Sequence, residues 1–192
     1  MVIPGQSRPG LTAGTCLRKD FGLLVEGRPE GQLFVSSWQL HESMPRFLVE
    51  STARRVGGIA GKTVGVLGLA FKRDTDDLRD SLAPKLCRLL LREGVSRLLL
   101  HDPFVPSVPE LRSRRINYAE DALQLFNRCS VVFIATNHSQ YAINSQHILA
   151  QARLNNVFIT DIWNTLEAGA AYINNTCAPD YDDVPGSFRM GT

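Results

Sequence analysis

The sequence lacks the cysteine spacing of a zinc site or of a disulfide framework. Its four cysteines, Cys16, Cys87, Cys129 and Cys177, lie far apart, and none forms a CxxC pair. No second histidine stands at metal-ligand spacing from His138 either, so we expect no metal. A reducing, cytoplasmic setting is the simpler expectation.

A surplus of one charge and a long apolar run are also missing. The 192 residues include 21 basic and 19 acidic side chains, spread along the chain, for a formal net charge of +2. No field of one sign is therefore available to attract nucleic acid. The longest apolar runs, such as Val131 to Ala135, are too short to span a bilayer, and the first ten residues contain two prolines and no apolar signal-peptide core. We expect neither nucleic acid nor a membrane as a partner.

The sequence also has no dinucleotide fingerprint. The segment GVLG, residues 65–68, lacks the three glycines of GxGxxG, and no acid stands at the ribose position after the next strand, although Asp102 is near it. A Rossmann-like fold that does not bind NAD in the usual manner is compatible with this pattern.

Apolar runs that alternate with helical patterns dominate the middle of the chain. Because the runs are almost continuously apolar and each is followed by a helical period, we predict an α/β fold with a doubly wound, mostly parallel sheet. The predicted strands are residues 63–67, 98–101, 130–135 and 157–160. The predicted helices are residues 81–93, 119–126 and 146–153.

The two ends of the chain have a different composition. Residues 1–31 are rich in glycine and proline and predict loop, whereas Ser36 to Val56 has the period of a long amphipathic helix that ends at a pair of glycines. The tail from Asn174 is predicted to be flexible. The expected organisation is residues 1–58 as a loop and connecting helix, 59–173 as the α/β domain, and 174–192 as a tail.

The loop after the first predicted strand is dense in charge. It reads GLAFKRDTDDLRDS, from Gly68 to Ser81. Ser81 is a candidate N-cap of the next helix, which would leave Lys72, Arg73 and Arg79 to meet an anion. The alternative is a solvated capping segment with internal ion pairs.

The loops after the other strands leave two interpretations open at each position. Asp102 could contact a ligand, but a turn role is favoured because proline follows it. His138 is as well suited to bind a loop backbone as a substrate. Trp163 could line a pocket, but packing of its loop is slightly favoured.

The segment GLTAGTCLRKD, residues 10–20, is the best candidate for chemistry. Its small residues would let a substrate approach the backbone, and Lys19 and Asp20 follow Cys16 closely enough to influence a nucleophilic thiol. By spacing alone, a small buried cysteine is the commoner interpretation.

Five segments in order resemble the UDP-glucose/GDP-mannose dehydrogenase family: GLTAGTCLRKD, HESMP, GKTVGVLGLAFKRDTDDLRDS, HDPFVP and TDIWNTL. The resemblance covers roughly residues 8–170. It implies the end of the family's central dimerisation region, followed by its nucleotide-sugar-binding domain. Family members use NAD to oxidise the primary alcohol of a nucleotide sugar to a carboxylate, through a cysteine thiohemiacetal and then a thioester.

The resemblance implies roles for individual residues. In C-x-x-K-D, Cys16 matches the nucleophile, Asp20 the carboxylate that positions or deprotonates water, and Lys19 a neighbour that orients it. Gly14 and Thr15 match the small residues under the sugar and phosphates. Phe71 and Lys72 match the family's pair that stacks on the base and contacts a phosphate or the sugar. Arg79 matches an arginine that reaches NAD from the nucleotide-sugar-binding domain.

Departures from the family pattern limit what the chain is expected to do alone. The NAD-binding N-terminal domain and the family's oxyanion-stabilising lysine and asparagine are absent from the sequence. His41 stands where asparagine is common, and Trp163-Asn164 where some members have arginine.

We therefore expect a UDP- or GDP-sugar as substrate and no turnover by this chain alone. The missing N-terminal region or a partner chain would supply the rest, with a homodimer when complete and a role in polysaccharide biosynthesis. A noncatalytic nucleotide-sugar-binding or regulatory module is the alternative.

Overall fold

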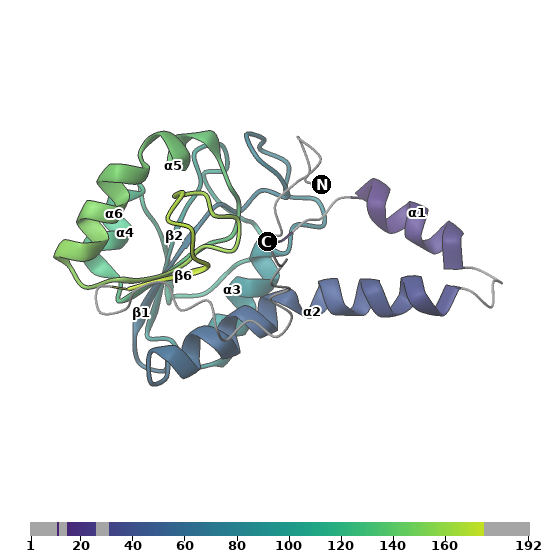
Figure 1. Ribbon diagram of the computed structural model, residues 1–192, viewed down its shortest axis with the longest axis horizontal. Helices are drawn as coiled ribbons and strands as arrows, with labels where there is room; N and C mark the ends of the chain where they lie inside the picture. The colour runs from purple at the N-terminus through teal and green to yellow at the C-terminus, as the bar shows by residue number, and fades with distance from the viewer. Residues whose placement is uncertain (1–10, 12–14, 26–30, 175–192) are drawn as a thin grey trace, which may run out of the picture.

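The computed structural model describes residues 11, 15–25 and 31–174 (Figure 1). From residue 63 onward, most strands are followed by helices, as the apolar pattern predicts. The helices are α1 (Thr15–Val25), α2 (Gly31–Arg55), α3 (Ala83–Arg92), α4 (Leu123–Arg128), α5 (Ser139–Ile143) and α6 (Ser145–Leu154). The strands are β1 (Thr63–Leu67), β2 (Arg97–His101), β3 (Ile116–Tyr118), β4 (Val131–Ile134), β5 (Phe158–Thr160) and β6 (Tyr172–Ile173).

The strands form one sheet in the order β3-β2-β1-β4-β5-β6. Strands β1 to β5 pair in parallel, and β6 joins β5 antiparallel. This order confirms the predicted doubly wound, mostly parallel sheet. It also places a topological switch point between β1 and β4, where the carboxyl ends of strands in such sheets open toward ligands.

Two apolar layers hold the sheet. On one face, Val64 and Val66 of β1 join the core cluster that contains α3 and the end of α2. On the other, Leu67 joins the cluster built from α4 and α6. Figure 1 shows α4, α5 and α6 on one side of the sheet and α2 with α3 on the other. Successive side chains of a strand point to opposite faces, so a strand buried on both faces must be apolar throughout.

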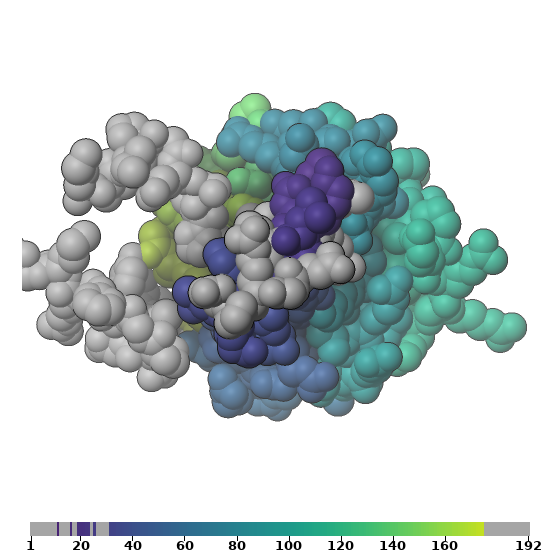
Figure 2. All heavy atoms as spheres, turned by 90° about the vertical axis from the view of Figure 1, so that its right-hand side faces the viewer, coloured from purple at the N-terminus to yellow at the C-terminus, as the bar shows by residue number. Residues whose placement is uncertain are grey.

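The prediction of loop across residues 1–31 is wrong where the structure describes this segment. Residues Thr15–Val25 form α1, which packs on α2 with the rings of Phe21 and Trp38 stacked at 4.9 Å between centroids. Helix α1 itself contains one glycine and no proline, so the composition of residues 1–31 as a whole concealed it. Figures 1 and 2 show this helical hairpin projecting from the α/β body, with α1 outermost.

Other boundaries also differ from the prediction. Helix α2 begins five residues earlier than expected and continues through Pro45, and α3 begins at Ala83 instead of Ser81. The stretch predicted as a helix from 119 is preceded by the short strand β3 and becomes helical only at Leu123. Strand β6 and helix α5 are too short for a periodic signal, so neither was predicted. The tail beyond Asn174 lies outside the described residues.

Candidate functional site

The loop between β1 and α3 lies at the carboxyl edge of the sheet and touches the loop after β4. Gly68 has a φ of +86°, and a Cβ placed there would lie 2.5 Å from Cβ of Thr136. The Thr136 hydroxyl donates to the carbonyl oxygen of Ala70 at 2.7 Å. The two loops therefore meet directly at the switch point.

Asp102, at the end of β2, organises this edge. Its Oδ2 accepts the backbone N–H groups of Leu69 at 2.6 Å and Ala70 at 3.1 Å. Its Oδ1 accepts those of Phe104 at 2.8 Å and Val105 at 3.0 Å. The turn role favoured from the sequence is what the structure shows, and the same carboxylate also anchors the residues just before Phe71.

The charge of Asp102 persists because these hydrogen bonds offset burial. Burial alone would raise the pKa of this carboxyl. The hydrogen bonds from His138, Leu69 and Phe104 outweigh it, so the pKa lies below 3.8. An ionised carboxylate is therefore part of the folded structure at neutral pH.

His138 is fully buried and links three loops. Its Nδ1 accepts the N–H of Asp74 at 3.0 Å, which assigns the proton to Nε2, and Nε2–H donates to Oδ2 of Asp102 at 3.0 Å. Of the two interpretations of His138, the one that binds loop backbone is therefore confirmed.

The tip of the same loop is tied to the start of α5. Asp74, at a φ of +53°, accepts the backbone N–H of Ser139 at 2.8 Å and also its hydroxyl. Burial would raise the pKa of Asp74, but the hydrogen bonds from Ser139 outweigh it and the pKa is lowered. The Arg73 guanidinium donates to the Ser139 hydroxyl at 2.9 and 2.8 Å. Arg73, predicted to be left for an anion, is thus engaged within the protein.

Phe71 and Lys72 lie between Ala70, which is held by Asp102, and Asp74, which is held by Ser139. The N–H of Phe71 donates to the carbonyl of Asp77 at 2.9 Å, which closes the loop on itself. The Lys72 Nζ lies 5.3 Å from the centroid of the Phe71 ring. Lys72 is exposed and Phe71 half-buried, so an aromatic face and an ammonium group are presented together at the carboxyl edge.

Arg79 is held by a neighbouring acid. Its Nη2 lies 2.7 Å from Oδ2 of Asp77, and its Nε donates to both carboxylate oxygens. These hydrogen bonds lower the pKa of Asp77 to about 2. An internal ion pair was the alternative interpretation of this charged segment, and it is present. The guanidinium remains mostly solvent-exposed.

Ser81 acts close to the role predicted for it. Helix α3 begins at Ala83, and the flanking Leu82 offers no capping side chain. The Ser81 hydroxyl nevertheless accepts the N–H of Ala83 at 3.2 Å and donates to the carbonyl of Leu69 at 2.7 Å. Ser81 therefore satisfies one N–H of the first turn of α3, although it lies one residue before the N-cap position.

Cys16 lies in the first turn of α1 and is exposed, as are Lys19 and Asp20. Positions i, i+3 and i+4 share one face of a helix, so α1 brings these three together, which the predicted loop did not. The pKa of Arg79 is raised, first by its hydrogen bonds to Asp77 and to a smaller extent by the electrostatic influence of Cys16. The face of Cys16 thus lies within electrostatic range of the β1–α3 loop.

The two small residues predicted to lie under the sugar and phosphates cannot be placed in detail. Gly14 lies outside the described residues, and Thr15 is described only as the first residue of α1. His41 lies in α2, with its ring centroid 5.9 Å from that of Trp38.

The loop after β5 forms the far wall of the edge. Trp163 is buried, and its Nε1–H donates to the carbonyl of Ala135 at 2.9 Å, so the packing interpretation holds. A cavity of about 370 Å³ lies beside it, lined by Arg73, Asn137, Ala142, Trp163, Asn164, Thr165 and Glu167. Asn137 belongs to the polar loop after β4, one of the loops that the sequence singled out, whereas Glu167, seven residues after the end of β5, was not predicted.

Within the described part of the chain, no three His, Cys, Asp or Glu side chains gather where they could hold a metal ion. None of the described helices is both long and apolar enough to cross a membrane.

Comparison with known proteins finds a family match over most of the α/β domain. The sequence model of the UDP-glucose/GDP-mannose dehydrogenase family, UDP binding domain, matches residues 65–168. The chain is 28% identical over 137 residues to UDP-N-acetyl-D-mannosamine dehydrogenase of Campylobacter jejuni, which covers 70% of this chain and 34% of the relative. UDP-glucose 6-dehydrogenase of Bacillus subtilis is 29% identical over 133 residues, covering 65% and 29%.

Solved structures give the same result. A UDP-glucose dehydrogenase from Pyrobaculum islandicum superimposes with a TM-score of 0.60 at 36% identity, over 69% of this chain and 32% of that one. This chain spans about a third of the length of the relatives it matches. Because the family match extends over more than half of its residues, the chain belongs to the UDP-glucose/GDP-mannose dehydrogenase family.

Proposed function

We propose that this chain is the nucleotide-sugar-binding portion of an NAD-dependent dehydrogenase that oxidises the primary alcohol of a UDP- or GDP-sugar to a carboxylate. The observation that carries the proposal is the β1–α3 loop, which lies inside the region matched to a UDP binding domain and presents Phe71 and Lys72 at the carboxyl edge. An aromatic face suits a base, and an ammonium group suits a phosphate.

The chemistry proposed for α1 follows from the residues on its exposed face. The Cys16 thiolate attacks the aldehyde carbon of the half-oxidised sugar, so an S–C bond forms and the carbonyl electron pair moves to oxygen. The adduct becomes a thioester when its carbon loses a hydride, which an NAD⁺ held mainly outside this chain would accept, and water then attacks the thioester. Asp20 accepts a proton from that water, and the thiolate leaves. Lys19, one residue before Asp20, orients the carboxylate.

The sequence has no GxGxxG loop at the switch point of this sheet. We therefore assign the main NAD contacts to residues outside this chain. Arg79 is the residue proposed to reach the cofactor. Residues 1–58 would then belong to the family's central region, and 59–173 to its nucleotide-sugar-binding domain.

Titration calorimetry of the chain with UDP and GDP tests binding directly. Lys72→Ala should weaken binding about tenfold or more, because a charge-assisted contact to phosphate is lost. Arg54→Ala is the matched control, since Arg54 is an exposed cation on α2, away from this edge. Equal effects of the two variants, or no binding to a chain shown to be folded, would sink the proposal.

Complementation tests the catalytic part. The chain alone should not reduce NAD. Mixed with an N-terminal dehydrogenase region, it should support activity that Cys16→Ser abolishes. If activity is restored and Cys16→Ser retains it, the noncatalytic module is the better description.

Assembly as a homodimer is also part of the proposal. Leu33, Phe34 and Leu40 of α2 are 73%, 44% and 69% exposed, which is unusual for large apolar side chains on one helix. Sedimentation of the complete enzyme would test it, with Leu33→Lys expected to shift the dimer toward monomer.

A further inference from the structure

A second hollow lies on the opposite side of the molecule from Phe71 and Lys72. It has a volume of about 440 Å³ and is lined by Thr63, Arg97, Leu98, Leu99, Asn117, Tyr118 and Arg128. Thr63 and Arg97 are the first residues of β1 and β2, and Arg128 is the last of α4. The hollow therefore opens near the amino ends of the strands, whereas the β1–α3 loop lies at their carboxyl ends.

The hollow exists because one face of the sheet edge has no helix over it. Residues 102–115, which connect β2 to β3, contain no helix, and α4 packs on β1 and β2. On this face Asn117 is exposed, whereas its register partner Leu99 is 6% exposed and lies beneath the hollow. Leu98 contributes backbone only, because its side chain belongs to the core on the other face.

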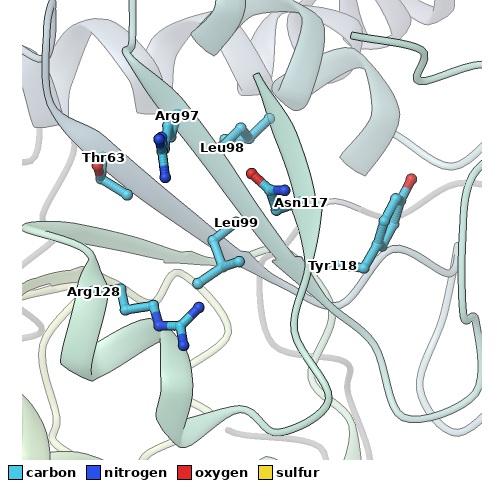
Figure 3. Close-up of a pocket in the computed structure, with 7 residues that line it drawn as sticks. All are labelled: Thr63, Arg97, Leu98, Leu99, Asn117, Tyr118 and Arg128. Atoms are coloured by element: carbon cyan, nitrogen blue, oxygen red, sulfur yellow. The ribbon is translucent and has the colours of Figure 1, made fainter. Parts of the chain in front are cut away.

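The lining carries two cations and no acid. Arg97 and Arg128 are both exposed, and no carboxylate of the described residues pairs with either. Figure 3 shows their guanidinium groups with Leu99 between them in this view, and Asn117 beside it. By contrast, Arg73 and Arg79 at the carboxyl edge are both engaged by neighbouring side chains.

We propose that this hollow binds a small phosphorylated ligand of nucleotide size. Two guanidinium forks favour the bidentate geometry of a phosphate group. The Asn117 amide and the Thr63 hydroxyl, on the strands to either side of β2, add neutral donors to the lining. The Tyr118 ring, like the side chain of its register partner Leu100, belongs to the other face, where its hydroxyl accepts the Val108 N–H at 3.0 Å. The surface of the hollow is therefore mainly polar, with the buried Leu99 beneath it. The volume lies within the usual range of small-molecule sites.

Titration of the full chain with AMP, followed by calorimetry and by backbone amide NMR, tests this site, with adenosine as the neutral match. We expect AMP to shift the amides of Leu99 and Asn117 and to bind about tenfold or more tightly than adenosine. Arg97→Gln and Arg128→Gln should each weaken AMP binding about tenfold, while Arg54→Gln should have no effect. All three positions are exposed, and thermal unfolding confirms that the variants are folded.

The same titration separates this site from the proposed nucleotide-sugar site. AMP binding here should survive Lys72→Ala, and UDP binding at the carboxyl edge should survive Arg97→Gln. AMP shifts confined to the β1–α3 loop, equal affinity for AMP and adenosine, or indifference to both arginine variants would overturn the inference. None of these results would bear on UDP binding at Lys72.

Discussion

Replacing Asp102 with alanine is expected to cost about 3–5 kcal/mol of the free energy of unfolding. The carboxylate accepts five hydrogen bonds, and its side chain is completely buried. Phe104 is 46% exposed, so its freed N–H can find water. The other four donors are buried, and an unpaired buried donor costs about 1–3 kcal/mol, although relaxation of the loops keeps the sum below simple addition.

Urea unfolding of the chain measures this loss. A domain with a total stability of about 5–15 kcal/mol would be left marginal, and its midpoint should fall by about 1.5–2.5 M at a slope of about 2 kcal/mol/M. Asp121→Ala is the control, because Asp121 accepts one N–H, that of Leu123 at 3.1 Å, at an exposed site. Its expected cost is about 1 kcal/mol.

A loss at Asp102 no larger than the loss at Asp121 would refute the role given to this carboxylate. An acid titration adds a second check. Because the pKa of Asp102 is lowered in the folded state, its contribution is present above the unfolded value near 3.8 and is lost as pH falls through the folded pKa. Asp102→Ala should remove this part of the acid-induced loss of stability.

Three further outcomes are expected, each measured by urea unfolding. Burial lowers the pKa of His101, so the unfolded state binds more protons and the free energy of unfolding should fall as pH drops below about 6.5. His101→Gln should reduce this fall, and the same fall in the variant would contradict the prediction. Gly68→Ala should cost more than about 2 kcal/mol, since its φ is positive and its Cβ would overlap Thr136, whereas Gly22→Ala, with nothing within 4 Å, should be neutral or stabilising; the reverse order would refute the contact. Trp163→Phe should cost about 1–3 kcal/mol through the lost hydrogen bond to Ala135, and a neutral effect would mean that the indole N–H contributes nothing.

The central sheet could be predicted well because its signal is local. A strand buried on both faces must be apolar along its whole length, and β1, β2 and β4 show this in the sequence. Short elements gave no such signal. Strand β3 has three residues and β6 two, and both exist through pairing with a neighbour rather than through a pattern of their own.

The candidate site was predicted as separate segments. The charged loop from Gly68 to Ser81 and the position of Cys16 were visible as motifs, but α1 was predicted as loop because glycine and proline dominate that region. A helix there depends on packing against α2, as in the stack of Phe21 on Trp38, and contacts between segments of this kind have no sequence period.

The sequence by itself determined the α/β alternation, the family motifs and the residue types available at the carboxyl edge, because these follow from apolar period and short-range spacing. Only the tertiary structure decided which of those residues are free. It buried His138 against Asp102, joined Arg73 to Ser139 and left Lys72 exposed. The physical reason is that burial and hydrogen-bond partners are set by chain segments far apart in sequence, which meet only when the sheet forms.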